Sequence, residues 1–316
     1  MPSLLVMDLR QLQTFLAVVD HGSFTAASRA LHTVQSNVSG HIARLEKELG
    51  VTLLDRTTGL PTAEGAVVVE RARRIQAEFS ALTADVHSVA TEVAGPARIG
   101  LIGTTARWLV PRLIETIAGR HPLVSVEIHD ATTTSLLLQL HSGAIELAVL
   151  TMPTNDPEVV TTPLFTEDRL IAMPTTDPLA AISQSRPLTL ADLDNHPLII
   201  EPKGRPFRDQ LDALFAERGY TLATKAEVDG TRLVASLTFE GFGASLLPAS
   251  AISNRTDIDW FTARVDGLPR RAVGLATRRH GLLSAPARAL RDALHDVISD
   301  LAEEQPGIHP HFSPDL

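Results

Sequence analysis

The chain has 316 residues, 44% of them hydrophobic, and a formal net charge of −9 at pH 7. This length predicts two or three domains, with enough apolar side chains for a sizeable core. The negative charge argues against a protein that coats nucleic acid along its whole surface. The chain contains no cysteine, which excludes disulfides and cysteine-ligated zinc and agrees with a reducing cytosol.

The N-terminus reads MPSLLVMDLR, a short apolar run without a basic leader or a small-residue cleavage site. We therefore expect no signal peptide. No uncharged apolar run approaches the ~20 residues needed to cross a membrane. These features predict a cytoplasmic protein that has no membrane partner.

Three short helices are predicted at the start of the chain by apolar side chains that recur every three or four positions. The first covers about 9–19, and the second covers about 24–31 with Ser23 placed to cap its free amides. The third has an apolar series closed by Gly50, and this series consists of Val38, Ile42, Leu45 and Leu49.

The third helix carries short or forked hydrogen-bonding groups opposite its apolar face. Such a helix can lie in the major groove, about 12 Å wide, where Gln and Asn read base edges and Ser and Arg hold phosphates. The candidate DNA contacts on and around it are Ser23, Thr25, Gln35, Ser36, Asn37, Ser39, His41, Arg44 and Arg56. The alternative is that the helix pair is a plain packing unit.

A β-prone run at 51–54 and a turn through 55–61 follow, which is the layout of a winged helix with Arg56 placed to meet the DNA backbone. From Met1 to Glu64 there are five basic and six acidic side chains, so the basic balance typical of DNA binders is missing. Clustering on one face, helix-end amides and doubling in a dimer would have to supply the attraction.

The stretch 62–92 contains no proline and keeps its apolar residues three or four apart over several turns. A helix this long with a narrow apolar stripe usually packs on a partner helix, so we expect dimerisation through it. The sequence Ala94-Gly95-Pro96 is expected to end the helix and to act as a hinge.

Beyond Ala97 strands and helices alternate, which predicts a parallel sheet with helices on its faces. Strands are expected at 98–102, 124–128, 145–150, 169–173, 198–200, 244–247 and 272–276, and helices at 108–117, 136–141, 207–218, 232–239 and 285–304. The tail from Gln305 is expected to be loose.

Short motifs run through the chain in a fixed order. In the N-terminal part they are LRQLQTF from Leu9, GSFTAA from Gly22, LEKELGV from Leu45, LDR from Leu54 and TAEG from Thr62. Later they are PRL from Pro111, HP from His121, SG from Ser142, IELA from Ile145, EGFG from Glu240 and LLP from Leu246. In order and spacing these motifs resemble those of the LysR-type transcriptional regulators over nearly the whole chain.

The resemblance implies an α/β protein with an N-terminal winged helix-turn-helix, a long linker helix and a two-lobed effector domain like a periplasmic binding protein. The expected domains are 1–65 for DNA binding, 66–94 for the linker and dimerisation, 95–304 for the effector and 305–316 for a flexible tail. Lobe I is expected at about 97–164 and 270–304, and lobe II at about 165–269. The implied partners are double-stranded promoter DNA, a small-molecule effector, a second copy in a homodimer or homotetramer, and RNA polymerase.

This sequence has Gly40 where the family commonly carries Arg or another long side chain. The change removes a DNA contact and costs roughly 1 kcal/mol of helix propensity relative to Ala. The base contacts therefore differ from the family pattern, although the helix that makes them is the same.

A ligand in such a two-lobed domain lies between the lobes, at strand ends and helix starts. The matching positions here are Thr104, Thr105, Arg107, Thr133, Thr151, Pro202, Lys203, Gly204, Arg205, Thr231 and Phe242. The hypothesis is a small organic anion, with Arg205 or Lys203 as its charge partner and threonine hydroxyls as donors. The alternatives are that these two cations form a solvated loop pair and that the threonines only cap helices.

An α/β enzyme or a solute-binding protein with a fused helical domain is the alternative function. The histidines form no HExxH pair, and there is neither a Gly-x-Ser-x-Gly elbow nor a glycine-rich phosphate loop. We therefore assign no catalytic residue, metal ligand or cofactor. A solute-binding component would share the cleft but would not need the first helices, and only the regulator would shift promoter DNA in a gel.

Overall fold

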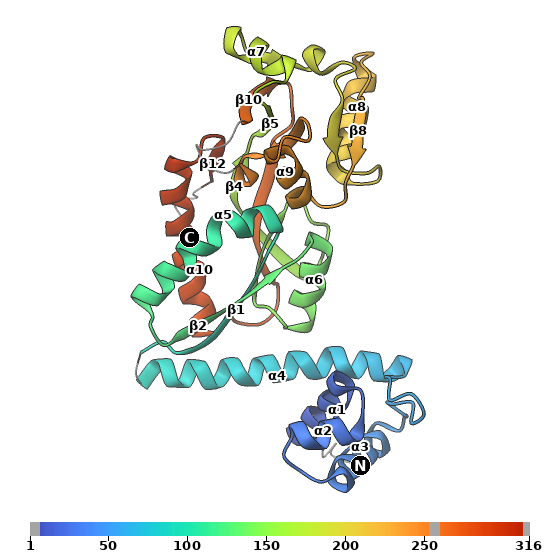
Figure 1. Ribbon diagram of the computed structural model, residues 1–316. Helices are drawn as coiled ribbons and strands as arrows, with labels where there is room; N and C mark the ends of the chain where they lie inside the picture. Colours follow the sequence, from blue (N-terminus) through green and yellow to red (C-terminus); the bar gives the residue numbers. More distant parts are fainter. Residues whose placement is uncertain (1–6, 91, 253–259, 312–316) are drawn as a thin grey trace.

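The computed structural model describes residues 7–90, 92–252 and 260–311, and it begins with a small three-helix unit (Figure 1). Its helices are α1 (Leu9–His21), α2 (Phe24–Ala30) and α3 (Gln35–Leu49), close to the predicted bounds. The Ser23 hydroxyl accepts a hydrogen bond from the Ala26 N–H and so caps α2, as predicted. The apolar faces of the three helices meet in one core around Phe15 and Leu45.

The predicted hairpin after α3 is reduced to a tight loop. Leu54 and Pro61 form a single antiparallel bridge in place of two paired strands. The Asp55 carboxylate accepts the Thr57 N–H at 2.7 Å, which closes the loop locally. Arg56 lies within this loop.

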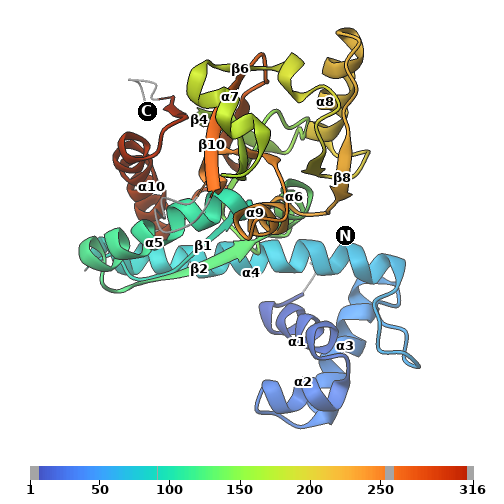
Figure 2. The same cartoon turned by 45° about the horizontal axis from the view of Figure 1, so that its top comes forward.

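Helix α4 (Ala63–Ala90) is a single 28-residue helix between the three-helix unit and the rest of the chain (Figures 1 and 2). It packs on α1 and, on the other part of the chain, on α6 (Thr133–Ser142) and α10 (Ala285–Glu304). Two of the three predicted hinge residues, Gly95 and Pro96, instead belong to a strand, because β1 (Gly95–Leu101) pairs with its neighbour from Gly95 onward.

The first lobe contains a six-stranded mixed sheet with the order β12-β4-β11-β3-β1-β2. Its other strands are β2 (Val124–Asp130), β3 (Leu147–Thr151), β4 (Val159–Glu167), β11 (Arg271–Arg278) and β12 (Ile308–Pro310). The predicted parallel pairing holds for β1, β2 and β3, whereas β11 and β4 run antiparallel to their neighbours. Helices α5 (Gly103–Arg120), α6 and α10 cover the sheet and complete its core.

The second lobe contains a four-stranded sheet with the order β6-β10-β5-β9 and a parallel pair β7-β8. Its strands are β5 (Arg169–Pro174), β6 (Leu188–Thr189), β7 (Leu198–Ile200), β8 (Thr224–Glu227), β9 (Ser245–Pro248) and β10 (Trp260–Asp266). Its helices are α7 (Pro178–Ser185), α8 (Pro206–Glu217) and α9 (Thr231–Phe239). Of these elements, β6, α7, β8 and β10 were not predicted from the sequence.

The chain passes between the lobes at Asp168 and again between β10 and β11. The first crossing lies a few residues later than the predicted border at 164, because β4 stays paired with β11 as far as the Glu167–Arg271 register. Both crossings therefore lie side by side, with the side chains of Glu167 and Arg271 in contact.

The predicted loose tail is corrected by the structure as far as residue 311. Gln305 is only 4% exposed and its side-chain amide donates to the Ala249 carbonyl at 2.9 Å. Strand β12 then pairs antiparallel with β4, and Ile308 enters the core of the first lobe. Backbone pairing and this one apolar side chain hold the segment, while residues 312–316 lie outside the described residues.

Candidate functional site

Helix α3 turns an apolar face into the core and a polar face outward. Val38, Ile42 and Leu45 are buried. The predicted contact residues that lie exposed on this helix are Gln35, Ser36, Asn37, Ser39 and Arg44. These side chains can therefore reach a duplex that approaches the outer side of the helix.

Local hydrogen bonds hold part of this polar face in place. The Thr25 hydroxyl donates to the Gln35 side-chain oxygen at 3.3 Å, which leaves the Gln35 amide NH₂ free to donate to a base. The Asn37 amide donates to the Thr33 hydroxyl at 3.0 Å. Gln35 and Thr25 thus form one unit that spans the turn between α2 and α3.

Three predicted contact residues have other surroundings. Ser23 is committed to capping α2. His41 is half-buried, and its Nδ1 is enclosed without a hydrogen-bond partner among the described residues, so it lies beside the core and not on the outer face. Arg56 is 75% exposed and lies 3.6 Å from the Glu46 carboxylate, a weak ion pair that leaves it free to meet a phosphate.

A cleft of about 820 Å³ lies between the two lobes. The first residues of α5, α6, α8 and α9 all line it. The residues that precede α5, α8 and α9 are Ile102, Arg205 and Gly230, and none of them caps its helix through a side chain. Since uncapped helix N-termini present free N–H groups and a partial positive charge, this cleft favours an anion.

Five of the predicted effector contacts line the cleft, namely Thr104, Thr133, Thr151, Arg205 and Thr231. The other predicted residues do not line it, and these are Thr105, Arg107, Pro202, Lys203, Gly204 and Phe242. Thr105 lies on α5 and is fully buried. Arg107 lines a separate groove of about 230 Å³ together with Trp108. Phe242 is exposed after α9, away from the cleft.

Several charged groups of the cleft already have partners. The Arg205 guanidinium donates to the Asp229 carboxylate at 2.6 Å, so the predicted charge partner is occupied within the protein. Arg232 of the second lobe forms an ion pair with Asp130 of the first lobe, which bridges the cleft.

Arg271 ties the crossings to the floor of the cleft. Its Nε donates to Glu167 at 2.7 Å, and its Nη2 donates to the Thr104 hydroxyl at 2.8 Å and to the Ser250 hydroxyl at 3.2 Å. Glu167 is fully buried and also accepts the Ser250 N–H. This pair is therefore compensated and joins the two lobes at their hinge.

Arg169 is one of several charged cleft residues that were not predicted from the sequence, and the others are Asp130, Glu201, Asp229, Arg232 and Arg271. It begins β5 directly after the crossing, and its guanidinium carbon lies 3.3 Å from the centre of the Phe207 ring. Its Nε is enclosed and has no hydrogen-bond partner among the described residues. Burial, with a smaller effect from Arg271, lowers the pKa of Arg169 to about 9, so the side chain stays charged at neutral pH.

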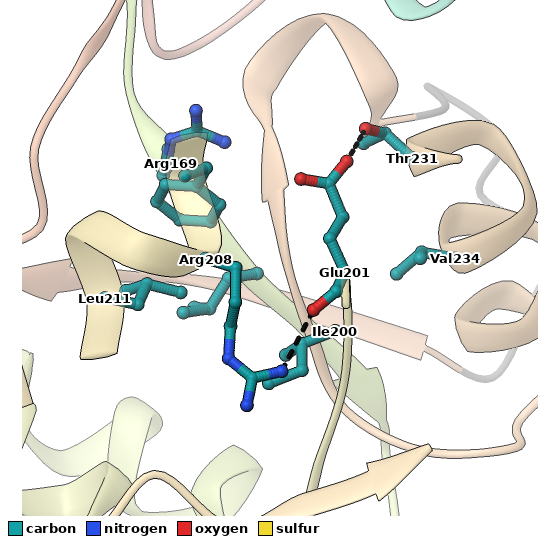
Figure 3. Close-up of a pocket in the computed structure, with 9 residues that line it drawn as sticks. Arg169, Ile200, Glu201, Arg208, Leu211, Thr231 and Val234 are labelled. Carbon is teal, nitrogen blue, oxygen red and sulfur yellow. Dashed lines mark hydrogen bonds between the residues drawn. The ribbon is translucent and has the colours of Figure 1, made fainter. Parts of the chain in front are cut away.

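Glu201 follows β7 and borders the same pocket as Arg169 (Figure 3). Its Oε1 accepts the Thr231 hydroxyl at 2.7 Å, and its backbone carbonyl accepts from Arg208 at 3.0 Å. Arg208 is itself compensated by Asp212 and Glu227. Glu201 has no ion-pair partner in the part of the chain that the structure describes.

A narrow recess of about 20 Å³ adjoins the cleft and is drawn in Figure 3. It shares four lining residues with the cleft, Arg169, Glu201, Phe207 and Thr231. Its remaining walls are Ile200, Arg208, Leu211, Val234 and Leu246. This volume admits about one water-sized group.

Among the described residues, no group of three or more histidine, aspartate or glutamate side chains is arranged to hold a metal ion. No described helix combines the length and the apolar character that crossing a membrane requires.

Comparison with known families matches both parts of the chain. A family model described as a bacterial regulatory helix-turn-helix protein of the lysR family matches residues 9–66. A second, described as the LysR substrate binding domain, matches residues 90–299. The two matches together cover α1 to α3 and the two-lobed part that holds the cleft.

Similar proteins match over nearly the whole chain. A probable hydrogen peroxide-inducible genes activator of Streptomyces viridosporus is 31% identical over 93% of this chain and 95% of its own. The DNA-binding transcriptional dual regulator OxyR of Escherichia coli K12 is 30% identical over 91% of this chain and 95% of its own. Full-length CbnR, solved with its target DNA, is 25% identical, with a TM-score of 0.67 over 92% of this chain and 100% of CbnR.

Proposed function

Because the chain belongs to the LysR family and is a DNA-binding transcriptional regulator, we propose that a small anion held in its cleft changes how it binds promoter DNA. The effector-binding domain of the family contains the cleft. What we propose beyond the family assignment is that the effector is an anion and that particular residues of the cleft bind it.

The observation that carries this proposal is Arg169, a desolvated cation in a cleft lined by uncapped helix N-termini. An anion would supply the hydrogen bonds that its guanidinium lacks, and hydrogen bonds to charged groups contribute about 1.5–3 kcal/mol. Arg169 takes the role first expected of Arg205 or Lys203, since Arg205 is held by Asp229 and Lys203 does not line the cleft.

The names of the relatives connect those proteins with hydrogen peroxide. The present chain contains no cysteine, so oxidation of a thiol to a sulfenic acid or a disulfide cannot be its switch. We therefore propose that it responds to a ligand bound without covalent chemistry. The cleft binds this ligand without turning it over, and the compound is expected to be recovered unchanged after incubation with the protein.

The DNA-contact surface of the proposal is the exposed side of α3. Gln35, Ser36 and Ser39 face base edges, while Arg44 and Arg56 meet phosphates. Two copies joined through α4 present two such helices to half-sites on one side of the duplex. The protein acts in the cytoplasm, where its promoters are, and a homotetramer and RNA polymerase are its further proposed partners.

The proposed mechanism couples the ligand to the distance between the two lobes. An anion on Arg169 also meets the N-termini of α5 and α6 across the cleft, and so it draws the lobes together on the side where Arg232 already bridges to Asp130. Closure shifts α6, which packs on α4, and α4 carries the DNA-binding unit. A preference of about 1–3 kcal/mol for the closed form is sufficient for regulation.

The test is a calorimetric titration of the full chain with aliphatic and aromatic carboxylates. We expect Arg169→Gln to weaken the binding of any active carboxylate at least about tenfold, while Lys203→Gln, outside the cleft, leaves the affinity unchanged. Footprints on promoter DNA should change on adding that compound to the wild type only. If Arg169→Gln bound carboxylates as tightly as the wild type, or if only neutral or cationic compounds bound, the proposal would be wrong.

A further inference from the structure

The cleft contains acidic side chains as well as basic ones, and nearly all of them are paired. Asp229 binds Arg205, Asp130 binds Arg232, and Glu167 binds Arg271. Among the described residues that line the cleft, Arg169 and Glu201 are the two charged side chains without an ion-pair partner. They are therefore the two charges that a ligand can neutralise.

Glu201 is positioned to receive a donor. One carboxylate oxygen accepts the Thr231 hydroxyl, and the other, Oε2, has no partner among the described residues. The residue is fixed from behind, because its backbone carbonyl is held by the buried Arg208. Its free oxygen thus borders the pocket on a rigid support.

Arg169 and Glu201 act on the same small volume. Both line the cleft and also the adjoining recess of about 20 Å³, which has room for about one water-sized group. A ligand with only negative charge that reaches Arg169 therefore also approaches the Glu201 carboxylate, and the two like charges repel. A ligand with opposite charges on neighbouring atoms avoids this repulsion.

We propose that the effector is an α-amino acid, whose carboxylate binds Arg169 and the uncapped helix ends and whose ammonium binds Glu201. This inference rests on the proposed function, since it presumes that Arg169 holds an anion in the cleft. The two charges of an α-amino acid are carried by substituents of one carbon atom. This arrangement matches Arg169 and Glu201, two oppositely charged side chains that line both the cleft and the adjoining recess. The mostly apolar walls beside them, including Ile200 and Val234, accept carbon and not a third charge.

The competing explanation is that Glu201 only serves α9. Thr231 is the first residue of α9, and a carboxylate near a helix N-terminus stabilises the helix by itself. Under that explanation the side chain contributes to folding and has no preference for an ammonium group. A Gln at this position keeps the hydrogen bond with Thr231 and loses only the charge, so it separates the two roles.

The experiment uses the full chain and the proteinogenic L-amino acids as probes. Melting temperatures identify the amino acids that stabilise the protein, and calorimetry then compares each of them with the matching desamino acid and decarboxylated amine. We expect an amino acid to bind at least about tenfold more tightly than either analogue. Glu201→Gln should remove the preference for the amino acid over the desamino acid, whereas Glu217→Gln, on the exposed side of α8, should retain it.

Each outcome decides the inference separately from the proposed function. Three results would refute the proposal of an α-amino acid effector. They are desamino acids that bind as tightly as amino acids, a preference for amino acids that survives Glu201→Gln, and no stabilisation by any amino acid. If other carboxylates still bound in a way that depends on Arg169, the proposal of an anionic effector would remain valid and only the α-amino acid would be excluded. If no anion of either panel bound, both would fall.

Discussion

At the scale of single residues, the ligand-binding capacity of the cleft depends on which of its polar groups already have partners within the protein. Three threonines that the sequence suggested as ligand donors are engaged within the protein: Thr104 accepts from Arg271, Thr133 accepts the Thr151 N–H, and Thr231 donates to Glu201. Their hydroxyls shape the site and retain only part of their hydrogen-bonding capacity. The unpaired charges at Arg169 and Glu201 therefore carry the recognition in our proposals.

Glycine positions in the DNA-binding unit give a prediction at the same scale. A Cβ added at Gly40 meets no atom within 4 Å, so Gly40→Ala should raise the free energy of unfolding of this unit by about 1 kcal/mol through helix propensity. Gly65→Ala should do the reverse, because its Cβ would collide with the Leu53 carbonyl oxygen. Urea unfolding curves of the full-length variants, compared with that of the wild type, measure both changes. A loss of stability in Gly40→Ala would contradict this account.

At the scale of elements, α4 has two different sides. One side packs on α1, α6 and α10 of its own chain. The other presents a straight apolar stripe to solvent, formed by Ile75, Phe79, Leu82 and Val86. A stripe of this kind on a 28-residue helix suits a second copy of the same helix.

Leu82→Glu tests this stripe. Leu82 is 57% exposed in the single chain, so the change should leave the fold intact but introduce two repelling carboxylates into a paired-helix interface. We expect the variant to sediment as a monomer at concentrations at which the wild type is a dimer. Gln76→Glu adds the same charge to the same helix beside the stripe and should not change the assembly. A dimeric Leu82→Glu variant would disprove dimerisation through this face.

At the scale of the whole molecule, Asp168 connects the two lobes and the C-terminal strand. Its Oδ1 lies 2.7 Å from Arg270 Nε and 3.0 Å from His309 Nε2, and its Oδ2 forms an ion pair with Arg264 Nη2 at 2.8 Å. Burial opposes its charged form, but the hydrogen bonds from His309 and Arg270 outweigh this effect and lower the pKa of Asp168. One carboxylate thus joins β10, β12 and the segment before β11 at the crossing.

This lowered pKa predicts how stability depends on pH. A carboxyl group with a depressed folded-state pKa stabilises the protein above its unfolded pKa of about 3.9, and the stabilisation is lost as the pH falls through the folded value. Asp168→Asn should therefore melt below the wild type at pH 7, and the difference should shrink below about pH 4. Melting curves across this range provide the measurement, with Asp300→Asn on the exposed side of α10 as control. A difference that persisted unchanged at low pH would refute the role of the charge.

Local patterns determined much of the fold. Apolar spacing and the Ser23 cap located α1, α2 and α3, and the same spacing located α4 and α10 within a few residues. These elements follow from one amphipathic face each, which is a property of neighbouring residues along the chain. Among the elements that the sequence missed, β8 and β12 are short strands that are stabilised by pairing with strands far away in the sequence.

The sequence by itself determined the family, the position of the helix-turn-helix and the absence of any thiol chemistry. Only the tertiary structure decided which charges remain free in the cleft. Arg205 and Arg169 have the same side chain, but the fold brings the Asp229 carboxylate into an ion pair with Arg205, whereas Arg169 lies against the Phe207 ring and has no ion-pair partner among the described residues. Since a charge acts on a ligand only when no nearer group compensates it, the chemistry of the site depends on contacts between residues that are distant in the chain.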